Sequence, residues 1–289
     1  MIKTVLPDLP DSKRYAVCLS FDFDTFSFRI GRKNLQSPTQ ISQSEFGNIG
    51  AQRILDILAK NSIKATWFIP GYTIDSFPET VKEIVSKGHE IAHHNYLHET
   101  PLELSRDEES FIMDKSNSII EKISGKKARG YRAPSWALSE NTIDLVIEKG
   151  FLYDSSLMAH DYLPYLVRTG DEARADGGFK FGKDSGLIEM PISWSLEDYP
   201  VFEMDEEAPG GGLRDARGVE WNWTADFDYM TKHLESGVFT LTNHPQVIGR
   251  GHRIEVLENI IDHISRRDDV VFMSMEDVAK SCKSKVDFR

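Results

Sequence analysis

The sequence has little cysteine, no long apolar run and a shortage of basic residues. Only two of its 289 residues are cysteines, Cys18 and Cys282, which excludes a disulfide framework. No stretch of 18 or more residues is apolar throughout, so no membrane span is predicted. Lys and Arg total 34 against 46 Asp and Glu, a formal net charge of −12. Phosphate repulsion therefore argues against nucleic-acid and anionic-membrane partners.

The amino-terminal segment lacks the uninterrupted apolar core of a signal peptide. Pro7, Asp8, Pro10 and Asp11 interrupt it within the first 17 residues. We therefore expect a cytoplasmic protein, and this location limits the substrates that it can reach.

Nucleotide-binding motifs are also missing from the sequence. Gly249 and Gly251 lack the third spaced glycine of a dinucleotide fingerprint. The three glycines at 210–212 have no adjacent Lys-Ser or Lys-Thr pair, so they do not form a P-loop. No organic cofactor is expected.

Short β-type runs alternate with helical patterns along the chain, which has no internal repeat and no low-complexity linker. Strands are expected at 15–23, 64–70, 89–95, 130–134, 186–193, 238–243 and 270–274. Helices are expected at 47–61, 76–88, 105–124, 139–149, 225–235, 254–265 and 275–282. This alternation predicts an α/β fold with a parallel sheet. Seven or so such units favour a distorted (β/α) barrel over an open sheet, built as a single domain over 1–289.

Two long stretches, 157–185 and 194–223, break this rhythm and are predicted to be irregular. Loops of this length in a compact domain are usually lids or binding loops. A solvated insertion or an oligomer contact is an equally good interpretation of both.

Ionisable residues recur where predicted strands end. Asp22 and Asp24 end the first strand, a histidine cluster ends the third, and Arg132 ends the strand at 130–134. His244 follows the strand at 238–243 and precedes a proline. Because ligands bind at the carboxyl ends of parallel strands, we expect these side chains to meet at one edge of the barrel.

Asp22, Asp24, His94 and His98 have the spacing of a metal site. Two carboxylates at i and i+2 share one face of a strand, and burying both is costly unless a cation or a proton intervenes. Two histidines at i and i+4 share one face of a helix, a common pair of metal ligands. Solvent-facing strand caps and a polar turn are the simpler alternatives. One aspartate and two histidines leave open positions on a divalent metal, as catalytic sites require.

These residues suit hydrolysis of an amide-type C–N bond. A bound metal lowers the pKa of water towards about 7 and polarises a carbonyl oxygen. The second aspartate of the pair can accept the proton of that water. His244 can protonate the leaving amine, and Arg132 can orient the base through a bidentate contact.

Four segments carry a resemblance to a known family. They read SFDFD at 20–24, HNYLH at 94–98, RAP at 132–134 and LTNH at 241–244. In this order they resemble the motifs of the polysaccharide deacetylase family, the NodB homology domain of carbohydrate esterase family four. The resemblance spans almost the whole chain and implies a NodB-like barrel of seven rather than eight units.

The resemblance also implies roles for individual residues. Asp22 matches the catalytic base and Arg132 its support, while His244 matches the general acid. The residues that match the metal ligands are Asp24, His94 and His98.

The same resemblance suggests three residues at the substrate. Ser135 and Trp136 follow the RAP motif, in a loop that supports the base and offers a backbone N–H to the oxyanion. Asp198 is the candidate for the family's fourth motif, whose aspartate tunes the acid. Asn95 departs from the pattern, because a hydroxyl residue usually stands there.

Several landmarks are similar to a subgroup of intracellular peptidoglycan-deacetylase-like proteins, allantoinase-like proteins and cyclic imide hydrolases. The subgroup implies a homo-oligomer. The metal is expected to be Zn²⁺, although Mn²⁺, Co²⁺ and Ni²⁺ suit the same donors. The expected activity is N-deacetylation of an acetamido sugar or glycan. The alternatives are hydrolysis of a cyclic imide or an allantoin-like ureide at the same site, and a non-catalytic carbohydrate- or metal-binding module.

Overall fold

A computed structural model describes residues 2–31, 37–203 and 212–283. The glycines at 210 and 211 lie outside the described residues, as does the acidic segment 205–207 of the second stretch predicted to be irregular. Both segments lie in 204–211. All predicted strands and all predicted site residues lie within the described ranges.

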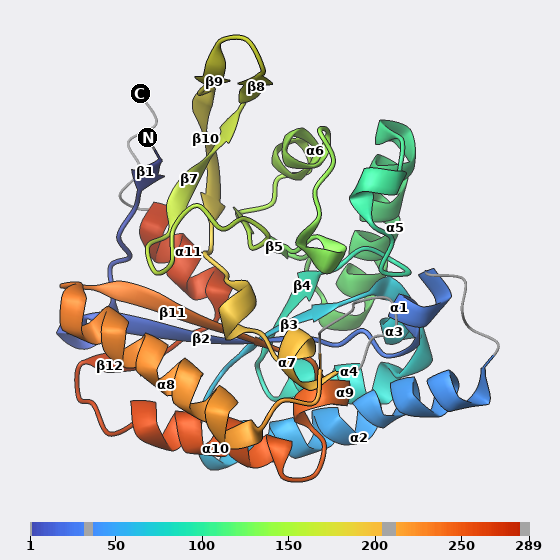
Figure 1. Ribbon diagram of the computed structural model, residues 1–289. Helices are drawn as coiled ribbons and strands as arrows, with labels where there is room; N and C mark the ends of the chain where they lie inside the picture. Colours follow the sequence, from blue (N-terminus) through green and yellow to red (C-terminus); the bar gives the residue numbers. More distant parts are fainter. Residues whose placement is uncertain (1, 32–36, 204–211, 284–289) are drawn as a thin grey trace.

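A run of seven parallel strands forms the centre of the molecule (Figure 1). In spatial order these strands are β11 (Gly237–Asn243), β2 (Tyr15–Asp22), β3 (Thr66–Ile69), β4 (Glu90–His93), β5 (Gly130–Tyr131), β6 (Tyr153–Asp154) and β10 (Lys183–Glu189). The predicted seven-unit α/β barrel is therefore confirmed.

The barrel is distorted at its seam and extended at one edge. Among the described residues, the segment after β10 meets β11 through one isolated parallel bridge, between Glu197 and Thr242. Beyond β10 the sheet continues with antiparallel β7 (Tyr165–Thr169) and β1 (Lys3–Thr4). A further short strand, β12 (Val270–Phe272), pairs with the start of β2.

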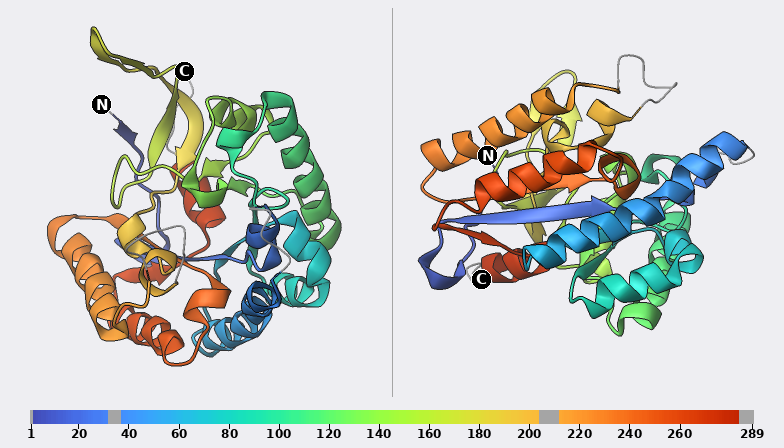
Figure 2. Two further views of the ribbon diagram at one scale, coloured as in Figure 1. Left: turned by 45° about the vertical axis from the view of Figure 1, so that its right-hand side comes forward. Right: turned by 90° about the horizontal axis from the view of Figure 1, so that it is seen from below.

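Helices surround the sheet on its outer side (Figure 2). They are α1 (Phe26–Gly31), α2 (Pro38–Lys60), α3 (Gly71–Ser76), α4 (Pro78–Ser86), α5 (Arg106–Ser124), α6 (Thr142–Glu148), α8 (Ala216–His233) and α10 (Arg253–Ile264). Two short helices, α7 (Tyr199–Phe202) and α9 (Pro245–Ile248), follow the last parallel strands, and α11 (Met275–Lys283) ends the described chain. No helix in the described ranges has the length and apolarity to cross a membrane.

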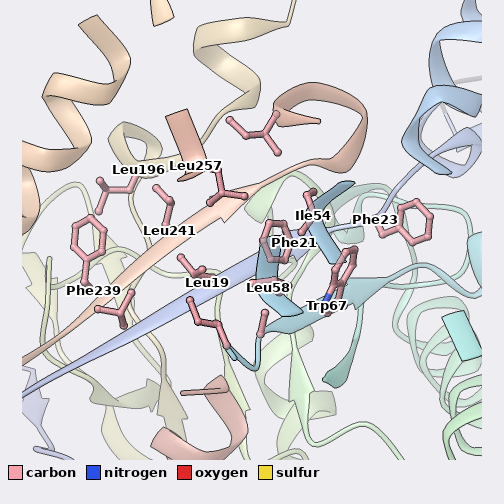
Figure 3. Packing of buried hydrophobic residues seen from close by; sticks show 14 of the residues in the cluster. Leu19, Phe21, Phe23, Ile54, Leu58, Trp67, Leu196, Phe239, Leu241 and Leu257 are labelled. Atoms are coloured by element: carbon pink, nitrogen blue, oxygen red, sulfur yellow. The ribbon is translucent and has the colours of Figure 1, made fainter. Parts of the chain in front are cut away.

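The main hydrophobic core lies between the outer face of the sheet and these helices (Figure 3). Successive side chains of a strand point to opposite faces, so Leu19 and Phe21 of β2 point outward together. They lie in one buried cluster with Ile54 of α2 and Leu257 of α10. This layer supplies most of the apolar burial that stabilises the barrel.

The inner face carries small and polar side chains at the alternate positions. Ala16 and Cys18 of β2 and Ala92 of β4 lie there in a second, smaller cluster, together with Met275 and Ala279 of α11. Because α11 fills this side of the sheet, the apolar inner core ends below the carboxyl ends of the strands. The polar positions that follow are free to build a site.

The prediction that 157–185 and 194–223 are irregular is wrong in part. The first contains β7, the hairpin of β8 (Glu172–Arg174) and β9 (Gly178–Lys180), and the start of β10. Figure 2 shows this hairpin projecting from the body of the molecule. The second contains a 3₁₀ turn at Trp194–Leu196, helix α7 and the first turns of α8. An exposed hairpin needs no apolar face, so its strands do not alternate apolar and polar residues. The glycines and charges of the first stretch therefore gave no strand pattern.

The helix predicted at 76–88 is α4, which begins and ends two residues inside the predicted bounds, and a separate short helix, α3, precedes it. Pro78 begins α4, and α3 ends at Ser76. A proline cannot donate the backbone hydrogen bond that a continuous helix requires, so the chain turns at Phe77.

Glu90 is a buried carboxyl group that joins several elements at the amino end of β4. Its Oε1 accepts a hydrogen bond from Tyr153 of β6, and its Oε2 accepts from Thr66 of β3 and from the backbone N–H of Glu276 in α11. Burial raises the pKa of Glu90 to about 7, although these hydrogen bonds oppose the shift.

We predict that the free energy of unfolding falls less in Glu90→Gln than in the wild type as the pH rises from 5 to 8. The folded protein binds the Glu90 proton more tightly than the unfolded chain, so the contribution of this group is full below about pH 4.5 and lost as the pH rises through about 7. The effect is on the order of 3 kcal/mol. Denaturant unfolding at both pH values measures it. Glu121→Gln, on the exposed side of α5, is the control. An unchanged pH dependence in Glu90→Gln contradicts the assignment.

Candidate active site

A cavity of about 270 Å³ opens at the carboxyl ends of the parallel strands. The residues that line it are Asp22, Asp24, Phe28, His94, His98, Ser135, Trp136, Trp194, Glu197, Tyr199 and His244. Strands β2, β4 and β11 end at this cavity, because the inner-face alternation of β2 continues to Asp22 and that of β11 to His244. The structure thus brings together residues more than 200 positions apart in the sequence.

Asp24, His94 and His98 converge on one point of the cavity. Their ligand atoms all lie within 4.8 Å of one another, and all three side chains are buried. His94 Nε2 lies 3.5 Å from Asp24 Oδ1, and His98 Nε2 lies 3.7 Å from Asp24 Oδ2. This is the spacing of donors around a cation rather than of hydrogen-bonded partners.

The chemistry of these donors fits a divalent metal. His94 Nδ1 donates to the carbonyl oxygen of Arg132 at 2.8 Å, which leaves Nε2 with its lone pair towards Asp24. Burial lowers the pKa of His94 to about 3, so its imidazole is neutral. Asp24 Oδ1 is buried and has no hydrogen-bond partner among the described residues. Burial also raises the pKa of Asp24 to about 7, which a bound cation would reverse.

The two histidines do not lie on one face of a helix, so that part of the prediction is wrong. β4 ends at His93, and residues 94–98 form a loop. Asn95 and His98 have φ values of 55° and 58°, in the left-handed region. Asparagine tolerates this region better than most residues. Its side chain donates to the Glu99 carbonyl and accepts from Tyr131, so Asn95 holds the loop where a hydroxyl residue was expected.

Asp22 forms a buried ion pair with Arg132. Arg132 Nη1 donates to Asp22 Oδ1 at 2.5 Å and to Ser20 Oγ at 3.1 Å. Nε donates to the carbonyl of Ser155, and Nη2 donates to its hydroxyl. Its guanidinium also lies 3.9 Å from the ring centroid of Phe68. With both partners fixed, the free edge of the Asp22 carboxylate points to the cavity that it lines.

A pair of buried carboxyl groups supports the segment that holds Arg132. Glu189 Oε1 accepts from the backbone N–H groups of Ser156 and Leu157, and Asp154 accepts from Ser156. Burial raises the pKa of both acids, well above its usual value for Glu189 and to about 6 for Asp154. Ser156 in turn accepts from the backbone N–H of Ala133, next to Arg132.

His244 is oriented by Asp198, which lies behind it and does not line the cavity. His244 Nδ1 lies 2.8 Å from Asp198 Oδ1, and Asp198 also accepts from the backbone N–H groups of His244 and Ile248. Nε2 therefore faces the cavity, 3.5 Å from Asp24 Oδ2. Burial lowers the pKa of His244, but Asp198, Asp24 and Asp22 overcome this effect and raise it to about 10.

Aromatic side chains form one wall of the cavity. The rings of Trp136 and Trp194 lie with centroids 4.2 Å apart, and Trp194 is 48% exposed. Ser135 and Trp136 have φ values of 55° and 52°, so the loop after Arg132 is held in a conformation that non-glycine residues rarely adopt. Such strain is characteristic of functional sites.

Glu197 is a cavity carboxyl group that the sequence analysis missed. Its Oε1 lies 3.9 Å from His244 Nε2, and its side chain is almost fully buried. Burial raises the pKa of Glu197 to about 8 against the effect of His244. The signal available in the sequence was its position next to Asp198, the candidate for the family's fourth motif.

Comparison with known proteins identifies the family. A model described as polysaccharide deacetylase matches residues 47–153. A peptidoglycan deacetylase from Helicobacter pylori is 32% identical over 93% of this chain and 96% of its own. The chain belongs to the polysaccharide deacetylase family. A peptidoglycan deacetylase-like protein from Gibberella zeae is 30% identical over 94% of this chain and 88% of its own.

Solved structures of this family share the fold. A Mycobacterium smegmatis protein described as belonging to the polysaccharide deacetylases has a TM-score of 0.86 and 31% identity, covering 99% of this chain and 96% of its own. The PuuE allantoinase has a TM-score of 0.80 and 21% identity over 97% and 94% of the two chains, a likeness of fold. Membership in this family implies a hydrolase that acts on C–N bonds, with an Asp-His-His site available for a metal.

Gly50 allows the turn after His244 to approach the barrel. A Cβ at position 50 of α2 would lie 1.9 Å from the carbonyl oxygen of Pro245. Helices α2 and α9 therefore meet through backbone atoms, and this contact sets the position of the segment that carries His244.

We predict that Gly50→Ala destabilises the fold by about 1–3 kcal/mol, the usual cost of overpacking. Gly218 of α8 is the matched control, since a Cβ there would meet the Asp215 carboxylate at an ordinary 3.7 Å. Gly218→Ala should stabilise by up to about 1 kcal/mol through helix propensity. Denaturant unfolding compares the two, and equal effects contradict the close approach.

Proposed function

We propose that the protein is a divalent-metal-dependent N-deacetylase that hydrolyses the acetamido group of an N-acetylated amino sugar. The observation that carries this proposal is the convergence of Asp24, His94 and His98 beside an arginine-paired Asp22 and an aspartate-paired His244. A site that only held metal or carbohydrate would need neither of the last two arrangements.

Asp24, His94 and His98 would hold the metal, with Zn²⁺ the first candidate and Mn²⁺, Co²⁺ and Ni²⁺ suited to the same donors. When bound, the metal lowers the pKa of water and polarises the acyl oxygen. The Arg132 carbonyl supports this role, because it fixes the tautomer of His94 in which Nε2 carries the lone pair.

Asp22 and His244 would move the protons. Asp22 accepts a proton from the attacking water, and its ion pair with Arg132 fixes the direction of the carboxylate. His244 keeps a proton on Nε2 and delivers it to the leaving nitrogen, while Asp198 holds Nδ1. Ser135 and Trp136 border the same space, which supports a contact between their loop and the acyl group.

The substrate class is supported by relatives and by the cavity wall. Two relatives that match nearly the whole chain carry the names peptidoglycan deacetylase and peptidoglycan deacetylase-like protein. The exposed ring of Trp194, which packs on Trp136, offers an apolar surface of the kind that stacks on sugar rings. Three further points stay predictions: a single catalytic domain over 1–289, a homo-oligomeric assembly and a cytoplasmic location.

The test is a side-by-side assay of the metal-loaded protein on chito-oligosaccharides, succinimide and allantoin. We expect acetate release from the chito-oligosaccharide, and Asp22→Asn should lower its rate by roughly 10²–10⁴-fold while the metal stays bound. Hydrolysis of succinimide or allantoin alone would replace the proposed substrate by a cyclic imide or ureide. Full activity in Asp22→Asn would reject this residue as the base.

Metal content tests the ligand assignment independently of activity. After dialysis against a mild chelator and readdition of Zn²⁺, the wild-type protein should retain close to one metal per chain by elemental analysis. His94→Ala should retain much less, because it removes one of three protein donors. His263→Ala, at an exposed ion pair with Asp228, is the control. Equal metal content in His94→Ala and the control would refute the site.

A further inference from the structure

Glu197 is buried in the cavity with an unused hydrogen-bonding group. The residue is 5% exposed, and its Oε2 has no hydrogen-bond partner among the described residues. Leaving such a group buried and unpaired costs stability. The adjacent Asp198, by contrast, accepts hydrogen bonds from His244 and Ile248. An uncompensated carboxyl group at a catalytic cavity indicates that a bound molecule completes it.

The backbone around Glu197 is held firmly. Glu197 forms the isolated bridge with Thr242 of β11, and the Asp198 N–H donates to the Thr242 carbonyl. On the other side, the Trp223 indole N–H of α8 donates to the carbonyl of Ser195. Both sides of the residue are therefore fixed, and its carboxyl group has a defined place in the cavity.

That place is beside the atom that would protonate the leaving group. Glu197 Oε1 lies 3.9 Å from His244 Nε2, too far for a hydrogen bond between them. A leaving atom within hydrogen-bond reach of Nε2 therefore also comes close to the Glu197 carboxyl group. The other carboxyl groups there already have roles, since Asp22 pairs with Arg132 and Asp24 lies in the ligand cluster.

An amide and an ester differ at this atom. The nitrogen of a secondary amide carries an N–H that needs an acceptor, whereas the corresponding ester oxygen carries lone pairs alone. In either protonation state the Glu197 carboxyl group keeps a lone pair that can accept from the amide N–H, whereas the ester oxygen offers this acceptor no donor. With the ester bound, the Glu197 acceptor stays buried without a hydrogen bond. This cost makes the site discriminate against the ester.

We propose that Glu197 is a specificity-determining residue that accepts a hydrogen bond from the N–H of the scissile amide, and so selects amides over esters of the same acyl group. This inference rests on the proposed function, because it assigns the leaving nitrogen to the side of His244.

The experiment compares two substrates that differ at the acyl-bearing atom, N-acetylated chitotriose and 2-O-acetylated cellotriose. In Glu197→Ala we expect kcat/KM to fall roughly 10–100-fold on the amide, the effect of one lost hydrogen bond, and to change less than about threefold on the ester. Glu197→Gln keeps a carbonyl acceptor and should recover most of the amide activity. Equal losses on both substrates, or no loss on the amide, would overturn the inference.

Stability and binding distinguish this inference from failure of the proposed function. A structural role predicts a lower melting temperature for Glu197→Gln, whereas we expect no decrease relative to Glu121→Gln on α5. If the wild type hydrolyses neither substrate, the proposed function fails, and calorimetric binding of N-acetylglucosamine against 2-O-acetylglucose still tests Glu197. The inference is supported if the wild type binds the amide more tightly than the ester and Glu197→Ala abolishes this preference. It is overturned if the wild type shows no preference for the amide.

Discussion

The buried Arg132 is the residue on which the site depends. Its guanidinium pairs with Asp22, and its backbone carbonyl accepts from His94, so one residue orients both the proposed base and a proposed metal ligand. Burying an ion pair is costly unless every donor finds a partner. Ser20 and Ser155 accept three further hydrogen bonds from the guanidinium, and its carbon lies 3.9 Å from the ring centroid of Phe68. Replacing either member of the ion pair would leave a buried charge without compensation.

The fold separates stability from chemistry along each strand. Outward positions of β2, such as Leu19 and Phe21, lie in the hydrophobic layer under the helices. Inward positions run from Ala16 and Cys18 through Ser20 to Asp22, so the same strand becomes polar as it approaches the cavity. The strain and unpaired groups of the site are tolerated because the outer layer is extensively packed.

Much of the fold and the core of the site could be predicted from the sequence. Strand–helix alternation gave the parallel run, because its period reflects which side chains are buried. Asp24, His94 and His98 were recognised by motif, although the helical explanation of the histidine spacing was wrong. Left-handed backbone at Asn95 and His98 brings the imidazoles together instead, and no spacing rule reports such a conformation. Glu197 was missed because its importance lies in two tertiary properties, an Oε2 without a hydrogen-bond partner and an Oε1 that lies 3.9 Å from His244 Nε2.

The balance of charge at the cavity favours the proposed cation. Asp22, Asp24, Glu197 and Asp198 are four acids within one buried site, faced by the cationic Arg132 and His244. Two of these carboxyl groups are paired, Asp22 with Arg132 and Asp198 with His244. Asp24 and Glu197 remain, each with one oxygen lacking a hydrogen bond. The imidazoles of His94 and His98 lie beside Asp24, so Asp24 and Glu197 call for different partners. A soft-to-borderline divalent metal suits the first, and a neutral N–H donor of the substrate suits the second.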